Sequence, residues 1–285
     1  MNLFNYLGGV EPIASLTEKV EVPQCSYAIE SLVSVHHIER QRDVMKEEIR
    51  HRQELVHFGK LLHEHGYVAA TDGNLSVRLD GQSVIITPTC ISKGMMRPQD
   101  LIVVDMDGHT LAGRRGVSSE VAMHLLIYKM RSDVNAVVHA HPPVATGYAA
   151  AGIPLNPAIV CEAVIGLGAV PLAPYATPGT SALADVLRPL IPEHQAILMA
   201  NHGAVTYAED LLRAYLKMEL VEHFARISLV TKLLGHEQLL TAHEIENLNI
   251  KRCNAALGDF ICERRTYDRS SQTKRNFSPH RTESS

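Results

Sequence analysis

Apolar and polar positions alternate most regularly in the middle of the chain, where they predict a helix and two hairpins. Apolar residues recur at helical spacing from Glu39 to His65, and Gly66 follows at the usual place for a glycine that ends a helix. Short apolar runs then flank Asp-Gly pairs at residues 80–81 and 107–108. Such pairs favour tight hairpin turns, so two antiparallel hairpins are predicted after the helix.

The second half of the chain alternates helices with buried strands. Helices are predicted over "EVAMHLLIYKM", "VATGYAAAG" and "SALADVLRPLI" and over residues 209–234, and strands over "NAVVHAH" and "QAILMA". A Gly- and Pro-rich region at residues 153–180 is expected to contain short strands. Strands and helices that alternate around hairpins predict an α/β fold, a three-layer α/β/α sandwich with a mixed, largely antiparallel central sheet.

The two ends of the chain differ from this middle part. Residues 1–38 show no sustained period and are expected to form an N-terminal extension, whereas residues 39–250 form the domain. Residues 251–285 form a C-terminal tail. From about residue 263 the tail is rich in Ser, Arg and Thr and almost free of aliphatic residues, so disorder is expected there.

Composition and charge narrow the class of protein. The chain has 27 Lys and Arg against 31 Asp and Glu, so no basic field favours nucleic acid as a partner. Its five cysteines form no C-x-x-C pair, which argues against a disulfide framework and a cysteine zinc site. No segment has the roughly 18 unbroken apolar residues of a membrane span, and the first residues lack the pattern of a signal peptide. A soluble cytoplasmic protein is expected.

Two histidines at the end of a predicted strand are the first candidates for chemistry. His139 and His141 are two residues apart, so on a strand their rings point to the same face. His202 follows another apolar strand and precedes a glycine that permits a tight turn. Three neutral imidazoles with an open fourth position are the arrangement of a catalytic zinc site.

The alternative is that these histidines are ordinary strand and loop residues. The chain has sixteen histidines, and a single H-x-H pair is a weak signal in such a background. Two other pairs, at residues 36–37 and at 63 and 65, have no third partner in the sequence and are expected to be solvated. Spacing alone leaves both interpretations of His139 and His141 open.

The start of the next predicted helix also has two interpretations. Ser118 and Ser119 are suited to cap a helix, and Glu120 is suited to the positive end of its dipole. A helix start with two hydroxyl groups is equally suited to bind an anion such as phosphate.

Six motifs in order give a resemblance to a known family. "DGNLSVR", "ITPT", "SSE", "HAH", "PLAPYATPGT" and "NHGAV", spread over roughly residues 50–250, resemble the class II aldolase and adducin-head family, whose sugar-phosphate members include L-fuculose-1-phosphate aldolase. The resemblance implies a homotetramer of α/β/α subunits with active sites between neighbouring subunits. It also implies one Zn²⁺ per subunit.

The resemblance implies roles for particular residues. His139, His141 and His202 look like the zinc ligands, and Glu120 looks like the catalytic acid/base that can also contact the metal when no substrate is bound. The phosphate- and substrate-binding set is Thr71, Gly73, Asn74, Thr89, Cys90, Ser118 and Ser119.

The reaction implied is zinc-dependent cleavage of a phosphorylated ketose, a ketose 1-phosphate, to dihydroxyacetone phosphate and an aldehyde. A Lewis acid stabilises the enediolate that forms, so no Schiff-base lysine is required. Cys161 and Glu162 stand where the fuculose-phosphate enzymes carry a tyrosine, and Cys90 stands where glycine is usual. Fuculose 1-phosphate, 5-deoxyribulose 1-phosphate and 5-methylthioribulose 1-phosphate therefore all remain candidate substrates.

Other outcomes remain open within the same fold. A sugar-phosphate dehydratase or decarboxylase would retain Glu120, whereas the 4-epimerase of ribulose 5-phosphates carries Asp at that position. A non-catalytic interaction module like adducin would have lost the metal histidines, and this chain retains all three.

Overall fold

The computed structural model describes residues 25–250, and side chains from residue 42 onward with the exception of residue 157. The chain divides into two compact units, Met1–Lys46 and Glu47–Ser285. All candidate site residues belong to the second unit. Residues 1–24 and 251–285, which include most of the predicted extension and the whole C-terminal tail, lie outside the described residues.

An eight-stranded sheet forms the centre of the second unit, in the order β4-β3-β2-β1-β5-β8-β7-β6. Every neighbouring pair is antiparallel except β6 and β7, which are parallel, so the predicted mixed, largely antiparallel sheet is confirmed. The strands are β1 (Asn74–Arg78), β2 (Ser83–Ile86), β3 (Ile102–Asp105), β4 (Thr110–Ala112), β5 (Ala136–Ala140), β6 (Leu172–Ala173), β7 (Ala196–Met199) and β8 (Gly203–Ala208).

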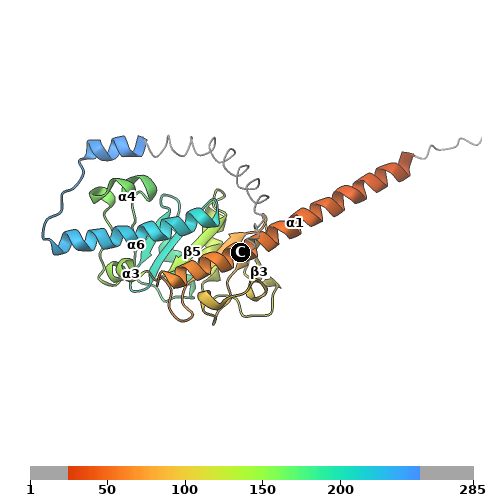
Figure 1. Cartoon of the computed structure of the whole chain (residues 1–285), viewed down its shortest axis with the longest axis horizontal. Coiled ribbons are helices and arrows are strands. Elements are labelled where there is room, and N and C mark those ends of the chain that lie inside the picture. The colour runs from red at the N-terminus through yellow and green to blue at the C-terminus, as the bar shows by residue number, and fades with distance from the viewer. Residues whose placement is uncertain (1–24, 251–285) are drawn as a thin grey trace, which may run out of the picture. The chain divides into compact units, whose positions relative to one another are not determined.

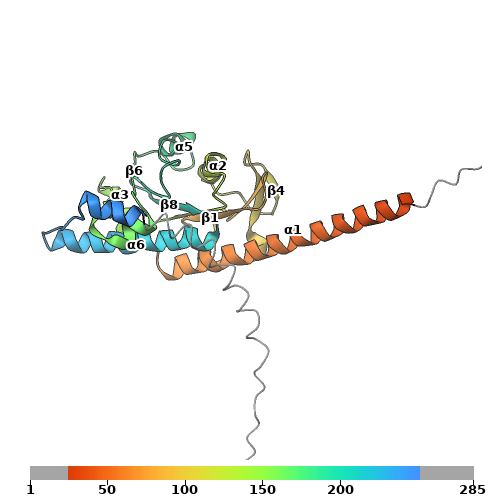
Figure 2. The same cartoon turned by 90° about the horizontal axis from the view of Figure 1, so that it is seen from above.

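Helices cover both faces of this sheet and complete the three layers. Figure 2 shows α2 and α5 on one face and α3 and α6 on the other, and in Figure 1 α6 lies across its face of the sheet. The helices are α1 (Cys25–Glu64), α2 (Val121–Met130), α3 (Pro143–Ala150), α4 (Cys161–Gly166), α5 (Ser181–Leu187) and α6 (Leu211–Leu233), with short 3-10 turns η1 (Lys93–Met95), η2 (Pro98–Asp100) and η3 (Pro157–Ile159). Residues 242–250 are helical as well.

Alternation along the strands divides the buried side chains into two cores. Ile85 belongs to the core beneath α3 and α6, whereas its neighbours Val84 and Ile86 belong to the core beneath α2 and α5. This division follows from the side-chain period of two along a strand. Apolar residues on both faces of the central strands therefore require helices on both sides.

Three elements differ from the predictions. The helix α1 begins at Cys25 rather than at Glu39, since residues 25–38 contain no Gly or Pro to end it. Residues 203–208, for which the pattern predicts no strand, form β8 and pair with β5 and β7. The helix α4 lies in the region expected to contain short strands.

The remaining predicted hairpins, helices and strands are present. Within residues 25–250, no helix combines the length and the apolar character needed to cross a membrane.

Candidate active site

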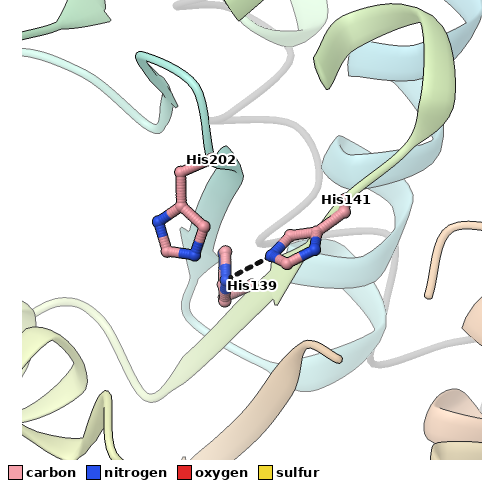
Figure 3. A group of neighbouring side chains, drawn as sticks. All are labelled: His139, His141 and His202. Carbon is pink, nitrogen blue, oxygen red and sulfur yellow. Dashed lines mark hydrogen bonds between the residues drawn. The ribbon is translucent and has the colours of Figure 1, made fainter. Parts of the chain in front are cut away.

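The sheet brings the three candidate histidines together, although His202 follows His141 by 61 residues in the chain. His139 lies in β5 opposite Val205 of β8, and His141 follows directly after β5 ends. His202 lies in the tight turn between β7 and β8. Because β8 pairs with β5, this turn lies beside the end of β5, and Figure 3 shows the three rings facing one another.

Glycine is required on both sides of the histidines. A Cβ atom on Gly203 would lie 2.6 Å from the carbonyl oxygen of Ala140, so the turn can approach β5 only without a side chain there. Gly73 has a φ of +68°, and a Cβ atom on it would lie 2.8 Å from the carbonyl oxygen of His139. Such left-handed backbone conformations and close approaches favour glycine.

The ring nitrogens of the histidines converge. Their candidate ligand atoms all lie within 4.8 Å of one another, and Nε2 of His141 is 3.1 Å from Nε2 of His139 (Figure 3). Nδ1 of His139 donates a hydrogen bond to the carbonyl oxygen of Ala204 at 2.9 Å. In the neutral ring, Nε2 of His139 therefore carries the free lone pair and faces the other histidines.

The carboxylate of Glu120 reaches the same point. Its Oε2 lies 3.1 Å from Nε2 of His139, and its Oε1 lies 3.2 Å from Nε2 of His202. The side chain of Glu120 is buried, and Asn74 donates a hydrogen bond to Oε2 at 2.8 Å. Glu120 is the N-cap residue of α2, but its side chain does not cap the helix and points toward the histidines instead.

Burial and charge set the protonation of these groups. Burial raises the pKa of Glu120, but the charge and hydrogen bond of His139 and the charge of His202 outweigh it and hold that pKa well below its usual range. Burial, followed by the charge of His139, lowers the pKa of His141 and of His202 to about 4. Both rings are therefore neutral near pH 7. Burial lowers the pKa of His139, but the charge and hydrogen bond of Glu120 outweigh it and raise that pKa, so this ring must release its proton when a metal ion binds.

The donor set fits a divalent metal ion such as zinc. Two nitrogens at about 2.0–2.1 Å from a tetrahedral zinc lie roughly 3.3 Å from each other, close to the 3.1 Å between Nε2 of His139 and Nε2 of His141. The buried Oε1 of Glu120 accepts no hydrogen bond from any described residue, and a cation would satisfy it. His139, His141 and His202 could hold such an ion, with Glu120 as a further oxygen donor.

The segments of the expected phosphate set lie around this point. Pro88 forms a β-bridge with Val117, and the backbone N–H of Thr89 donates to Gly116 at 3.1 Å, which brings the "ITPT" segment beside the start of α2. Ser118 is buried, and its hydroxyl accepts a hydrogen bond from the backbone N–H of Glu120 at 3.3 Å. The exposed members of the set are Thr71, Thr89, Cys90 and Ser119.

Two members of that set have features that the sequence does not reveal. The amide of Asn74 is buried between Glu120 and His124. Cys90 has a φ of +56°, a left-handed conformation that favours glycine. The phosphate-binding roles of both residues stay predictions.

A buried lysine lies near these loops and is not among the site residues predicted from the sequence. Lys93 is only 1% exposed, and its Nζ donates hydrogen bonds to the carbonyl oxygens of Thr71 at 2.9 Å and Ile91 at 3.0 Å. Burial lowers the pKa of Lys93 to about 8 against the opposing charge of Asp72. Lys93 thereby links the loop of Thr71 to the segment that carries Cys90. The apolar neighbours of Lys93 in "ISKGMM" do not reveal this burial.

Residues 53–229 match the family described as Class II Aldolase and Adducin N-terminal domain, and this segment contains every candidate residue. The chain belongs to this family. The predicted resemblance is therefore confirmed, and the family includes aldolases and decarboxylases that act on sugar phosphates.

Relatives of known activity cover most of the chain. A 5-deoxy-D-ribulose 1-phosphate aldolase of Bacillus thuringiensis is 36% identical over 200 residues, which are 70% of this chain and 93% of the relative. A 3-oxo-tetronate 4-phosphate decarboxylase of Escherichia coli O6:H1 is 35% identical over 212 residues, which are 72% of this chain and 98% of the relative.

Solved structures of the family show the same fold. A structure of L-fuculose 1-phosphate aldolase matches with a TM-score of 0.67 and 37% sequence identity, and the match covers 71% of this chain and 95% of that one. The α/β sandwich predicted from the sequence is therefore the fold of the class II aldolase family.

Proposed function

We propose that this class II aldolase family member is a zinc-dependent aldolase that cleaves a ketose 1-phosphate to dihydroxyacetone phosphate and an aldehyde. The observation that carries the proposal is the convergence of Nε2 of His139 and His202 on the carboxylate of Glu120 at 3.1 and 3.2 Å, with His141 beside them. The similarity to a 5-deoxy-D-ribulose 1-phosphate aldolase supports a ketose 1-phosphate as substrate.

His139, His141 and His202 would hold the zinc ion. When bound, zinc supplies a Lewis acid that stabilises the negative charge of the enediolate. The hydrogen bond from Nδ1 of His139 to Ala204 fixes the orientation of this ring, and β8 fixes the turn that carries His202.

Glu120 moves the proton that cleavage and product formation require. It is buried beside the histidines, where water competes little for its carboxylate, and Asn74 orients Oε2 by a hydrogen bond of 2.8 Å. General acid/base catalysis of this kind contributes about 10² to 10⁴ in rate.

The phosphate would bind at the loops around the start of α2. Several groups there are suited to this role, since N–H groups at a helix start favour anions. They are the hydroxyl groups of Thr71, Thr89, Ser118 and Ser119 and the backbone at Gly73 and Cys90.

The proposal also includes the assembly of the protein, a homotetramer in the cytoplasm with active sites between subunits. Light scattering on the purified protein tests the tetramer.

Screening the purified protein against ketose 1-phosphates tests the main proposal. The panel contains fuculose, 5-deoxyribulose and 5-methylthioribulose 1-phosphates and their unphosphorylated forms, with enzymatic detection of dihydroxyacetone phosphate. We expect release from at least one phosphorylated ketose, with kcat/KM far higher than for its unphosphorylated form. Equal kcat/KM for the two forms, or no dihydroxyacetone phosphate from any compound, would contradict the proposal.

Glu120→Gln is expected to retain zinc and to lose cleavage, because three imidazoles suffice to hold the ion whereas the amide cannot take up a proton. We expect kcat to fall about 10² to 10⁴-fold. Metal content by mass spectrometry and kcat are measured on the same sample. A Glu120→Gln variant with parental kcat would exclude the acid/base role.

His141→Ala is expected to lose most of the bound zinc, because it removes one of three nitrogen ligands. His223→Ala provides the matched control, since His223 is exposed on α6 and is not one of the three converging histidines. Zinc per chain and its restoration after chelation are compared for the two variants. Full zinc binding by His141→Ala, with binding equal to that of His223→Ala, would overturn the ligand assignment.

A second candidate is a decarboxylase of a sugar-acid phosphate. The similarity to 3-oxo-tetronate 4-phosphate decarboxylase favours it, as does the lack of a tyrosine at residues 161–162. Loss of CO₂ from a 3-oxo acid also leaves an enediolate, so the same residues would serve. Release of CO₂ from 3-oxo-tetronate 4-phosphate without cleavage of any ketose 1-phosphate would select this candidate.

A further inference from the structure

A continuous row of buried polar side chains leads away from Glu120 into the core between α2 and the sheet. Asn74 donates to Glu120 at 2.8 Å, and its Oδ1 lies 2.5 Å from Nε2 of His124. Nδ1 of His124 lies 2.6 Å from the hydroxyl of Ser76, which in turn lies 2.8 Å from the hydroxyl of Tyr128. Asn74, Ser76, His124 and Tyr128 are all less than 5% exposed.

Two periodicities explain why these side chains meet. Asn74 and Ser76 are two residues apart on β1 and therefore point to the same face of the sheet. Glu120, His124 and Tyr128 are four residues apart and therefore lie along one stripe of α2. The stripe of the helix faces the two strand positions across the core.

Each hydrogen bond in this row has a defined direction. The carboxylate of Glu120 can only accept, so Asn74 presents its NH₂ group to it and its Oδ1 to His124. Oδ1 can only accept as well, so Nε2 of His124 carries the proton. Burial, followed by the charge of His139, lowers the pKa of His124 to about 3, so this ring is neutral near pH 7.

The directions of the hydrogen bonds from His124 to Ser76 and Tyr128 follow in the same way. Nδ1 of the neutral His124 ring is an acceptor, so Ser76 donates its single hydroxyl hydrogen to it. Ser76 then accepts from Tyr128, whose pKa is raised by burial, so that it stays protonated. The tautomer of His124 is thus set by the amide of Asn74, and the hydroxyl of Ser76, which can donate or accept, donates to match it.

The other tautomer would reverse the amide of Asn74. If Nδ1 of His124 carried the proton, Nε2 would become an acceptor facing Oδ1 of Asn74. The amide would then rotate and turn its oxygen toward the carboxylate of Glu120, where no hydrogen bond can form. The orientation of Glu120 therefore depends on a ring that does not contact it.

We propose that His124 is a positioning residue whose Nε2–H tautomer, with Nδ1 hydrogen-bonded to Ser76, fixes the amide of Asn74 and through it the carboxylate of Glu120. The tautomer follows from the hydrogen bonds alone, and its effect on turnover rests on the proposed function. A histidine that merely fills the core would affect stability without affecting turnover.

The tautomer is measured directly by nuclear magnetic resonance of protein labelled with ¹⁵N-histidine. The signals of His124 are assigned by their loss in His124→Gln. We expect a protonated Nε2 and an unprotonated Nδ1 at pH 7, and the same tautomer in Ser76→Ala, because Oδ1 of Asn74 still accepts from Nε2. A protonated Nδ1 in the parent protein would overturn the proposal, whether or not the protein cleaves any sugar phosphate.

Turnover tests the positioning role. His124→Met removes both hydrogen bonds, and we expect kcat to fall about 10- to 100-fold, as loss of an oriented hydrogen bond to a charged group predicts, with zinc content and KM nearly unchanged. His124→Gln can donate to Asn74 and accept from Ser76, and it is expected to recover most of kcat. Parental kcat in His124→Met, or equal losses in both variants, would overturn the role.

The control removes a comparable buried hydrogen bond elsewhere. Tyr148 is buried, and its hydroxyl donates to Ser228 at 2.9 Å in the other core. Tyr148→Phe is expected to lower the melting temperature without changing kcat, which separates loss of stability from loss of positioning. Absence of activity in the parent protein would overturn the proposed function and leave the tautomer to be judged by its own measurement.

Discussion

Lys93 is a cation in a place where water cannot solvate it, and its contacts explain how this is tolerated. Its ammonium group is hydrogen-bonded to the carbonyl oxygens of Thr71 and Ile91, one from each loop of the expected phosphate site. A buried positive charge beside these loops also attracts a dianion. Its pKa of about 8 means that the charge is present below that pH and is lost above it.

Lys93→Met is expected to raise KM for the phosphorylated substrate about tenfold with little loss of zinc. The substitution removes the hydrogen bonds that connect the two loops and the positive charge beside the phosphate. In the parent protein KM is expected to rise as the pH increases through about 8, and in the variant this rise is expected to disappear. Lys129→Met, which removes an exposed lysine of α2, is the control. The same KM profile in Lys93→Met and in the parent would exclude the role of Lys93.

Some residues of the candidate site can be predicted from the sequence and others cannot. The histidines and Glu120 are predictable, since their types and order carry the resemblance. The choice of Glu120 between capping α2 and facing the histidines depends on a tertiary contact with β5, and the amide of Asn74 is engaged by His124 from another element. Burial of Lys93 was not predictable, because its apolar neighbours do not specify where the ammonium group lies.

At the scale of elements, the site depends on how closely β1 approaches β5. Asn74 is the register partner of His139, and Gly73 immediately precedes this pair. Gly73 has a positive φ, and its Cα faces the side chain of Val68 and the carbonyl oxygen of His139. Any side chain there would separate the two strands beside His139, the first of the proposed metal ligands.

Gly73→Ala is therefore expected to lower both stability and zinc affinity. The left-handed φ costs about 1 kcal/mol for alanine, and the overpacking costs about 1–3 kcal/mol more. Gly66→Ala is a matched control, because Gly66 has a φ of +70° but a Cβ atom on it would meet no atom within 4 Å. Urea unfolding is measured for both variants. Equal destabilisation would show that the close approach to β5 contributes nothing.

Local sequence patterns predict some of the helices and strands but not β8 and α4. The hairpins and α2 follow from local turn residues and helical spacing, so they are predictable. The strand β8 consists of six residues with no alternation of polar and apolar positions, because all six are buried, and only its pairing with β5 and β7 defines it. The helix α4 is six residues long, too short for its period to be read.

For the whole molecule, the division of the chain near Lys46 has a direct test. Among the described side chains of α1, those buried in the core, Leu55, Phe58 and Leu62, follow this point, and the family match begins at residue 53. Deletion of residues 1–46 is expected to change the free energy of unfolding by no more than about 1 kcal/mol, within the range of surface changes. Zinc content and urea unfolding are compared with those of the full chain, and loss of zinc binding or of cooperative unfolding would contradict this.

The fold class was predictable at this scale because alternating strands and helices with apolar faces allow few arrangements. The strand order was not, since β1 joins β5 across α2, and β5 joins β8 across more than 60 residues.

The pairing of β5 with β8 has a consequence for how the proposed metal site would form. His139 and His141 are near neighbours in the chain. His202 comes close to them only after β8 has paired with β5, which closes the long segment between these two strands into a loop. Long-range pairings of this kind form slowly compared with local hairpins. Zinc bound by all three histidines, as proposed, would therefore mark a chain whose central strands have already assembled, and the rate of metal uptake during refolding would report when the sheet closes.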